Sequence, residues 1–487
     1  MKKFFKNIKT GTKKVTEILR KPFIAIANSK IVKTFFESKF YNWHRKMWDT
    51  KAMIMHGITG LIMCFIIEWL SKHSFVAAVE FVIHHTGPFI YNSYVIFAIL
   101  SIVFIMGRQC FGRIMVLFVF WVLGITNCIV LSNRVTPFGY TDLYMITDLL
   151  TMQDSQYFTA EQAMMVMVAL VLFIIIMINK YKKEKKMQHV RPFWLRMLSC
   201  VLLIGSLYPV TDFLRSTGIL TTYFGNLAQG YRDYGFLYGF STSVFDRGMS
   251  RPFNYNKDTV LKMVEEDSAV QNSIDVDKKP NVVVILLESI YDVSECEFME
   301  TSEDPIPFLH YLEENYSSGH CIVPVVGAGT CNSEFEVLTG MSCAYFGPGE
   351  YPQKTILKEI DQCESYADVM SDLGYGTHVV HNNGGNFYSR AHAFSLMGFD
   401  SFTCKEMLDI TEYTPLGSWP TDDILLEATM DSMDTTEGSD FVYTILVGSH
   451  GAYPEYVVEE NPAIQVTCEG KTQEQTNAWN YYVNRIH

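Results

Sequence analysis

The sequence predicts two structural parts: an N-terminal domain of five transmembrane helices, and an extracellular α/β domain whose mostly parallel sheet is flanked by helices. Three observations support this prediction. Of the 487 residues 48% are hydrophobic, and the long apolar runs fall in the first 213. Charge is divided, because residues 1–213 hold 25 Lys and Arg against 11 Asp and Glu, whereas the remaining residues hold 14 against 41. Beyond residue 280, short β-branched runs alternate with helical segments, as in α/β folds.

The predicted membrane domain covers residues 52–213. Five apolar runs in it are long enough to cross about 30 Å of hydrocarbon: residues 52–70, 87–107, 112–132, 162–179 and 194–213. A shorter apolar run at 75–85 is predicted to lie at the membrane interface.

Basic residues set the predicted orientation. Residues 1–51 contain 14 Lys and Arg against three acidic residues, interspersed with aromatic side chains. This pattern is typical of a basic amphipathic segment on the cytoplasmic face of the cell membrane, and a solvated tail is the alternative. Further basic residues occur at Arg108, Arg113 and from Lys180 to Lys186, so the positive-inside rule places the N-terminus in the cytoplasm. Five crossings then place the rest of the chain outside the cell.

Two segments connect the predicted spans to the α/β domain. The loop after residue 132 contains Arg134, which could hold a lipid phosphate or pair with Asp142. Residues 214–279 are predicted to be an extracellular linker with one helix near 258–266. Its many aromatic side chains are expected to pack on the catalytic domain.

Residues 280–487 are predicted to form the α/β domain. Strands are expected at 281–287, 376–380 and 441–447, and helices near 305–316, 332–339 and 355–373. The first strand is an apolar run typical of a strand buried on both faces of a parallel sheet.

An acid and a hydroxyl are expected to meet at the edge of this sheet. Glu288 follows the first strand, and Thr330 follows a glycine turn at the start of a helix. A helix N-terminus favours anionic groups, and open α/β sheets bind ligands beyond their strand ends. A divalent metal shared by Glu288 and Thr330 would lower the pKa of the hydroxyl and make Thr330 a competent nucleophile. The alternative is an ordinary helix-capping threonine.

Further candidate site residues follow two later strands. His381 and His450 each come just after a strand, and Arg390 lies nine residues beyond His381. Arginine can bind a phosphate through two N–H groups, and histidine can donate a hydrogen bond or carry a proton. Each histidine could instead be an ordinary surface residue.

Taken together, these motifs resemble the membrane-bound branch of the alkaline phosphatase and sulfatase superfamily, the lipoteichoic acid synthases and related phosphoglycerol transferases. The resemblance covers roughly residues 280–487 and rests on Leu-Leu-Glu288-Ser, Gly-Thr330-x-x-Ser-Glu-Phe, His381 to Arg390, and Ser-His450 before a Tyr-Pro. It implies that Thr330 is catalytic, that Glu288 and Thr330 bind metal, and that His381, Tyr388, Arg390 and His450 bind substrate. Tyr388 stands where the family commonly has Trp. The Cys/Ser-x-Pro-x-Arg motif of sulfatases proper is absent, so Cys331 is interpreted as a small apolar neighbour.

The same resemblance implies one divalent metal, Mn²⁺ or Mg²⁺, held partly by an Asp-His pair. No Asp-His dipeptide occurs in this sequence. The remaining ligands are therefore expected beyond residue 487, in a domain that is C-terminally incomplete here. The alternative is a chain that truly ends at residue 487 and binds the metal weakly.

The activity implied is transfer of glycerol phosphate from a phosphatidylglycerol-like lipid to a glycolipid or teichoic-acid acceptor, with no nucleic-acid partner. Two alternatives stay open. One is a phosphoethanolamine transferase, and the other is a non-catalytic membrane-anchored protein that binds a phosphate or a lipid.

Overall fold

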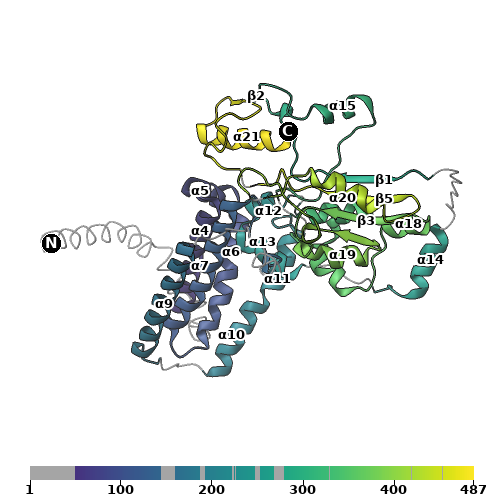
Figure 1. Ribbon diagram of the computed structural model, residues 1–487. Helices are drawn as coiled ribbons and strands as arrows, with labels where there is room; N and C mark the ends of the chain where they lie inside the picture. The colour runs from purple at the N-terminus through teal and green to yellow at the C-terminus, as the bar shows by residue number, and fades with distance from the viewer. Residues whose placement is uncertain are drawn as a thin grey trace.

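The computed structural model describes residues 50–487 except 144–159, 187–191, 222–223, 225, 247–252, 268–278, 328, 418 and 452. The predicted basic segment 1–51 therefore lies almost entirely outside the described residues. Figure 1 shows a bundle of long helices and, beside one end of it, an α/β part.

Four helices in the described part are long and apolar enough to cross a membrane. They are Ala52–Lys72 in α4 (Thr50–Lys72), Thr86–Phe104 in α6 (Thr86–Leu100) with η1 (Ser101–Phe104), Gln109–Ser132 in α7 (Gln109–Asn133), and Phe193–Ser216 in α10 (Phe193–Gly205) with α11 (Leu207–Ser216). Many of their large apolar side chains face outward, which suits hydrocarbon as a solvent.

The described residues contain four candidate spans, not the five predicted. The remaining predicted span, 162–179, falls on the helix α9 (Ala160–Lys183), many of whose side chains lie outside the described part. α9 packs on α7, where the rings of Phe118 and Phe173 stack 3.7 Å apart. The run at 75–85 forms α5 (Phe75–His84), whose 10 residues are too few to cross a bilayer.

The aromatic segment beyond residue 213 packs on the membrane helices, not on the catalytic domain as expected. It forms α12 (Leu227–Tyr234) and α13 (Phe236–Phe245), whose Tyr231 and Phe236 join a core with Ile67 and Ile96. Gly235 between them has φ 83°, and a Cβ there would lie 2.4 Å from the Asn92 amide nitrogen, so only glycine fits. The helix predicted near 258–266 is confirmed as α14 (Lys257–Asp267).

The α/β part is built on a four-stranded parallel sheet in the order β1-β5-β3-β4. The strands are β1 (Val282–Leu286), β3 (Gly376–His381), β4 (Ser401–Thr403) and β5 (Asp440–Ile445). β1, β3 and β5 confirm the three predicted strands. The prediction that the first strand is buried on both faces is wrong, because β1 lies at the edge of the sheet and Val283 and Ile285 are exposed. A separate antiparallel pair, β2 (Met299–Thr301) and β6 (Val466–Cys468), was not predicted.

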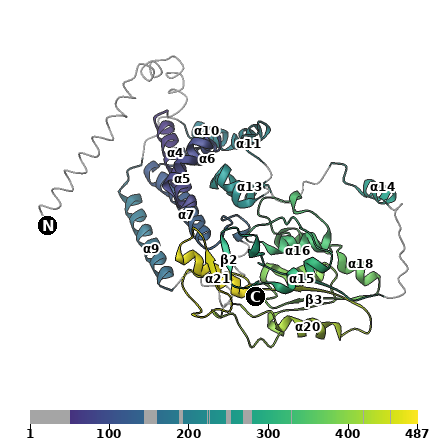
Figure 2. The same ribbon diagram turned by 90° about the horizontal axis from the view of Figure 1, so that it is seen from above.

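Helices cover both faces of the sheet, and the alternation of side chains along β5 explains how. Phe441, Tyr443 and Ile445 pack toward a core shared with α16 (Thr330–Thr339), α18 (Tyr366–Asp372) and α19 (Arg390–Leu396). Val442 points the other way, to Leu425 and Ala428 of α20 (Ile424–Met433). Figure 2 shows α16 and α18 on one side of β3 and α20 on the other. This two-sided burial is typical of parallel sheets.

Most of the predicted helices are present with altered ends. The helix predicted near 305–316 is α15 (Pro307–Asn315). The segment 355–373 is not one helix but three short ones: α17 (Pro352–Thr355), η4 (Leu357–Glu359) and α18. α18 starts late because Ser365 and Asp368 form a capping box at its N-terminus. The other elements are η2 (Val293–Glu295), η3 (Cys343–Tyr345), η5 (Phe387–Ser389), η6 (Lys405–Met407) and α21 (Gln473–Ile486).

Candidate active site

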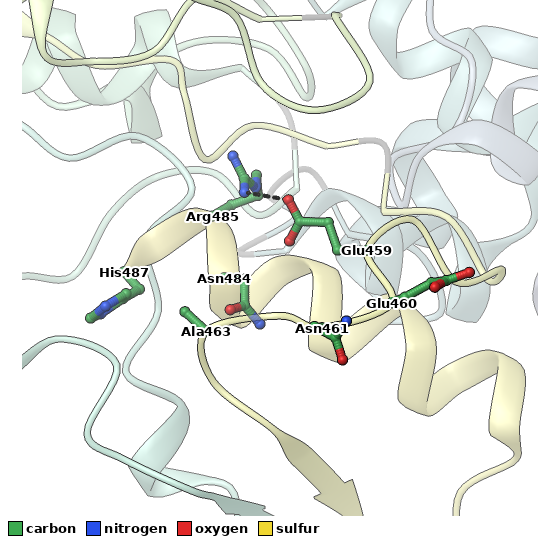
Figure 3. A pocket seen from close by; sticks show the side chains of 7 residues that line it. All are labelled: Glu459, Glu460, Asn461, Ala463, Asn484, Arg485 and His487. Carbon is green, nitrogen blue, oxygen red and sulfur yellow. Dashed lines mark ion pairs between the residues drawn. The ribbon is translucent and has the colours of Figure 1, made fainter.

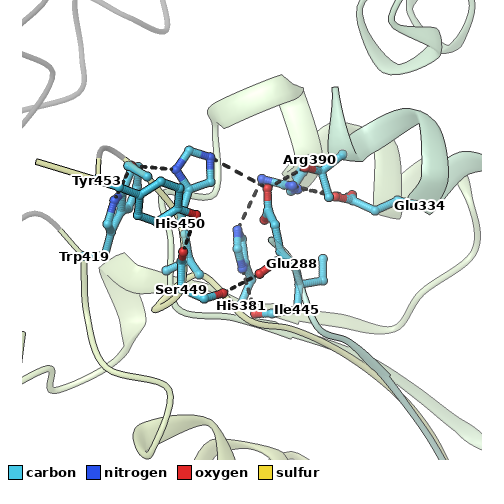
Figure 4. Close-up of polar contacts among 12 residues, drawn as sticks. Glu288, Glu334, His381, Arg390, Trp419, Ile445, Ser449, His450 and Tyr453 are labelled. Atoms are coloured by element: carbon cyan, nitrogen blue, oxygen red, sulfur yellow. Dashed lines mark hydrogen bonds and ion pairs between the residues drawn. The ribbon is translucent and has the colours of Figure 1, made fainter. Parts of the chain in front are cut away.

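The carboxyl ends of β1, β3 and β5 bring three predicted site residues to one edge of the sheet. Glu288 lies two residues after β1, His381 is the last residue of β3, and His450 follows β5 by five residues. Figure 4 shows these side chains converging, with Arg390 and Glu334 behind them. The strands are parallel and adjacent, so their ends meet at the same edge, which is where open α/β sheets bind ligands.

Glu288 and Thr330 are in direct contact. The Thr330 hydroxyl donates a hydrogen bond to Glu288 Oε1. Thr330 is the first residue of α16, and Gly329 before it has φ 84°, a left-handed conformation that favours glycine. The structure thus brings together an acid at a strand end and a hydroxyl at a helix N-terminus.

Cys331, next to Thr330, is fully buried, and burial raises the pKa of its thiol well above the ordinary value. A protonated, inaccessible thiol is a poor nucleophile. This environment agrees with the interpretation of Cys331 as an apolar neighbour.

His450 is the most accessible of the convergent groups. Its side chain is 42% exposed, and Nε2 lies 4.0 Å from Glu288 Oε1. The other ring nitrogen, Nδ1, is 2.9 Å from the Gly451 carbonyl oxygen. The Trp419 ring packs on the imidazole with 4.6 Å between centroids, and its Nε1–H donates to the same carbonyl at 2.8 Å. Nδ1–H therefore donates to Gly451, which leaves Nε2 directed toward the acid.

His381, Arg390 and Glu334 form a buried chain behind the accessible groups. Arg390 donates to both oxygens of Glu334, from Nε at 3.1 Å and from Nη2 at 2.5 Å. Arg390 Nη1 lies 3.2 Å from His381 Nε2, while His381 Nδ1 lies 2.9 Å from the carbonyl oxygen of Ile445. Burial, and next the nearby guanidinium, lower the pKa of His381 well below its ordinary value. The His381 imidazole is therefore neutral. Its Nδ1–H donates a hydrogen bond to the Ile445 carbonyl oxygen, and its Nε2 accepts one from Arg390.

Tyr388 forms a wall next to this chain. It is buried against Tyr351, with 5.4 Å between ring centroids, and the Arg390 guanidinium lies 5.2 Å from its ring centre. Tyr388 and Ser389 have φ 55° and 58°, and Ser289, next to Glu288, has φ 61°. Such conformations are strained for residues other than glycine and cluster at functional sites.

Several residues that support the site were not predicted as site residues. Glu334 lies one helical turn after Thr330, so the i, i+4 spacing could have placed both on one face of α16. Ser449 donates to the Glu288 carbonyl oxygen at 2.5 Å. The Asp422 carboxylate accepts hydrogen bonds from the backbone N–H groups of Val447 and Gly448, each at 3.0 Å. It thereby fixes the loop that carries His450, a role for which the local sequence gives no signal.

A segment of the membrane part reaches the same region. Arg134 donates from Nη2 to Asp142 at 2.6 Å, which confirms the structural pairing considered above. Burial alone would lower the pKa of Arg134, but Asp142, and after it the Tyr351 and Tyr388 hydroxyls, raise it. The Thr141 hydroxyl donates to the Gly349 carbonyl oxygen at 2.7 Å, which joins the two parts of the chain.

The predicted metal site is only partly formed by the described residues. Glu288 and Thr330 supply two adjacent oxygens, which suits Mg²⁺ or Mn²⁺. No cluster of three or more His, Cys, Asp or Glu that could hold a metal occurs among residues 50–487 as described. The donor set therefore falls short of the roughly six ligands that such an ion prefers.

A pocket of about 540 Å³ at the end of α21 is separate from these residues. Figure 3 shows its lining, in which the Arg485 guanidinium lies 3.6 Å from Glu459. None of the predicted site residues contributes to it.

Three of the solved structures that match this chain are distant neighbours. Streptococcus pyogenes phosphoglycerol transferase GacH, in complex with sn-glycerol-1-phosphate, is 20% identical, with a TM-score of 0.41 over 49% of this chain and 63% of that one. Lipoteichoic acid synthase LtaP from Listeria monocytogenes is 18% identical, with a TM-score of 0.34 over 46% and 55%. Lipooligosaccharide phosphoethanolamine transferase EptA from Neisseria meningitidis is 13% identical, with a TM-score of 0.44 over 87% and 76%.

Two sequence comparisons found matches. The "Putative cyclic beta-1,2-glucan modification protein" of Rhizobium meliloti (strain 1021) is 25% identical over 225 residues, 46% of this chain. The chain covers 34% of the length of that curated relative. The family model described as Sulfatase matches residues 280–487. The α/β part that follows the apolar helices is therefore similar in sequence to the sulfatase family.

Proposed function

We propose that this protein is a membrane-anchored phosphotransferase in which Thr330 is the nucleophile. One observation carries the proposal: the Thr330 hydroxyl, at the N-terminus of α16, donates a hydrogen bond to Glu288 at the carboxyl edge of the sheet. The hydroxyl has an acceptor for its proton, and the helix N-terminus favours an incoming anion.

The proposed reaction has two steps. The Thr330 oxygen attacks the phosphorus of a phospholipid while Glu288 accepts its proton. The bond from phosphorus to the diacylglycerol oxygen breaks. Diacylglycerol leaves after it takes a proton from His450, the nearest accessible donor. In the second step a hydroxyl of the acceptor attacks the phosphothreonine and gives its proton to His450. The bond from phosphorus to the Thr330 oxygen breaks, and Thr330 regains its proton from Glu288.

Mn²⁺ or Mg²⁺ belongs to the proposal as a bound cofactor. Glu288 and Thr330 would hold it, and when bound it lowers the pKa of a coordinated hydroxyl and neutralises phosphate charge.

We assign the remaining predicted residues to substrate binding and positioning. The Arg390 guanidinium has five N–H groups, of which Glu334 and His381 engage three. Because Arg390 is buried, the proposal requires the neighbouring wall to move before the other two N–H groups can bind a phosphate. In this proposal His381 orients the guanidinium, Tyr388 shapes the wall of the pocket, and the accessible His450 contacts the phosphate.

The transferred group is proposed to be glycerol phosphate from a phosphatidylglycerol-like lipid, with a glycolipid or teichoic-acid acceptor. GacH is named as a phosphoglycerol transferase, and the curated relative is named for modification of a glucan. EptA is named as a phosphoethanolamine transferase, and that head group is the alternative. Full-length protein given each labelled phospholipid separately distinguishes the two, since only the true donor passes label to an acceptor.

A non-catalytic binding protein is the other alternative, because the described residues offer an incomplete set of metal ligands. Such a protein would bind the lipid and release no diacylglycerol in the presence of Mn²⁺ or Mg²⁺.

The nucleophile is tested by a pair of substitutions in the full-length protein. Thr330→Ala is expected to lower transfer at least 10³-fold and to abolish the phosphothreonine adduct seen by mass spectrometry. Thr330→Ser keeps a hydroxyl and should keep measurable transfer. Wild-type rates in Thr330→Ala would exclude the mechanism.

A further inference from the structure

We propose that a cavity at the end of the helix bundle binds the phosphate-bearing head group of a membrane phospholipid. The inference rests on the proposed function, because this cavity would hold the lipid substrate next to the catalytic loop. Its volume is about 540 Å³, and α4, α5, α7, α12 and the loop after α7 form its walls. Its lining includes Lys72, Phe81, Leu131, Val135, Tyr231 and Arg232.

Arg232 adds a positive charge to the lining of this cavity. The neighbouring Lys72 is already neutralised, since its Nζ lies 3.7 Å from the buried Glu68 carboxylate and donates to the Arg232 carbonyl oxygen at 3.0 Å. The Arg232 side chain is exposed and forms no ion pair with the described residues. A phosphodiester matches a guanidinium well, because two parallel N–H groups can bind its two oxygens.

The opposite charges in the lining limit the kind of ligand. Glu80 lines the cavity and is exposed, and Asp233, also in the lining, lies 3.9 Å from His85. Carboxylates would repel a bare anion but accept hydrogen bonds from hydroxyl or ammonium groups. The lining therefore suits a head group that joins a phosphate to such donors, as glycerol phosphate and phosphoethanolamine both do.

The cavity lies where a lipid and the catalytic loop can meet. Val135 lines it, and a Cβ built on Gly327 would lie only 3.1 Å from the Val135 Cβ. Gly327 precedes Thr330 by three residues, so one side chain contacts both the cavity and the catalytic turn. Val76 and Ile83 of α5 are each 64% exposed, and apolar side chains beside the cavity suit acyl chains that stay in the bilayer.

Binding is tested by calorimetry on the full-length protein in nanodiscs of phosphatidylcholine. The probes are dihexanoyl phosphatidylglycerol, dihexanoyl phosphatidylethanolamine, glycerol phosphate without chains, and inorganic phosphate. At least one of the two lipids should bind more tightly than either chain-free probe. Arg232→Gln should weaken its binding about tenfold, because a hydrogen bond to a charged group is lost.

Matched variants separate the cavity from general effects. Ala77→Trp fills the cavity, whereas Val76→Trp places the same side chain on an exposed neighbour outside it. Only the first should weaken binding. Lys257→Gln removes an exposed positive charge far along the chain and should leave affinity unchanged. Thermal unfolding shows whether each variant is folded. If Ala77→Trp does not fold, the lipid affinity of Arg232→Gln alone tests the inference.

Two outcomes overturn the inference: wild-type affinity in Arg232→Gln, or chain-free phosphate that binds as tightly as the lipids. Thr330→Ala keeps the cavity intact and should bind lipid while losing transfer. If the wild type binds lipid but transfers nothing, the proposed function is contradicted and the lipid-binding cavity is still supported. Failure of the inference and failure of the proposed function therefore give different results.

Discussion

At the scale of single residues, the buried ion pair between Arg390 and Glu334 sets the character of the site. Arg390 is 1% exposed and Glu334 is 0% exposed, so neither charge has access to water. Leaving either one unpaired would cost about 3–5 kcal/mol. The neutral His381 completes the environment, because a second positive charge at 3.2 Å from the guanidinium would be strongly unfavourable.

His381 should make the stability of the protein depend on pH. Its pKa in the folded state lies below the unfolded value of about 6.5, so the unfolded chain binds the additional proton. The stability from neutral His381 is therefore present above pH 6.5 and is lost as pH falls toward the folded pKa. Between pH 6.5 and 5.5 the expected loss is about 1 kcal/mol.

Denaturant unfolding of the full-length protein in detergent measures this loss. His381→Gln keeps a donor and an acceptor and should remove that part of the pH dependence. His392 is exposed, so His392→Gln is the control and should retain it. Equal pH dependence in wild type and His381→Gln would contradict the buried neutral state.

At the scale of elements, the turn into α16 decides where Thr330, the proposed nucleophile, lies. Gly329 has φ 84°, and a Cβ there would lie 3.0 Å from the Tyr351 ring and 3.3 Å from Val325. Gly340 ends the same helix with φ 69°, and a Cβ there would meet nothing within 4 Å. The two glycines share a left-handed backbone and differ in how closely other atoms approach.

Substitution by alanine should separate these two effects. Gly340→Ala is expected to cost about 1 kcal/mol of stability, the ordinary penalty of that conformation, and to leave transfer almost unchanged. Gly329→Ala adds a steric clash next to Thr330, so transfer should fall by about 10²-fold, as expected for a displacement near 1 Å. Stability and transfer rates of both variants test this, and equal rates would show that the turn does not position the hydroxyl.

How much of this could be predicted depends on the range of the interaction. Glu288 and Thr330 were found because a strand end and a glycine-to-helix turn leave local patterns in the sequence. Glu334 and Asp422 were missed as site residues because their roles come from partners 56 and 25 or more positions away. The aromatic segment around Tyr231 was placed on the wrong part of the chain for the same reason. The hydrophobicity of this segment predicts that it packs against another part of the protein, but does not predict which part.

At the scale of the whole molecule, α9 decides on which side of the membrane the α/β part lies. The Glu184 carboxylate, just after α9, accepts hydrogen bonds from the backbone N–H groups of Cys110 and Phe111 at 2.8 and 2.7 Å. The C-terminal end of α9 thus caps the N-terminus of α7, where a carboxylate is favourable. The stacked Phe118 and Phe173 rings continue the contact, so the two helices run side by side in opposite directions.

The predicted orientation, with a cytoplasmic N-terminus and an extracellular α/β part, requires α9 to cross the membrane antiparallel to α7. If α9 crosses with α7, the basic loop after α9 lies in the cytoplasm and Cys321, which is exposed, lies outside. In intact cells, a membrane-impermeant maleimide should label Cys321 in the wild type but not in a Cys321→Ser control. A cysteine introduced by Lys185→Cys should react only after permeabilisation. If α9 does not cross the bilayer, every later segment lies on the opposite side from the one predicted. Both labelling results would then be reversed, and the proposed catalytic residues would lie on the same side as the N-terminus.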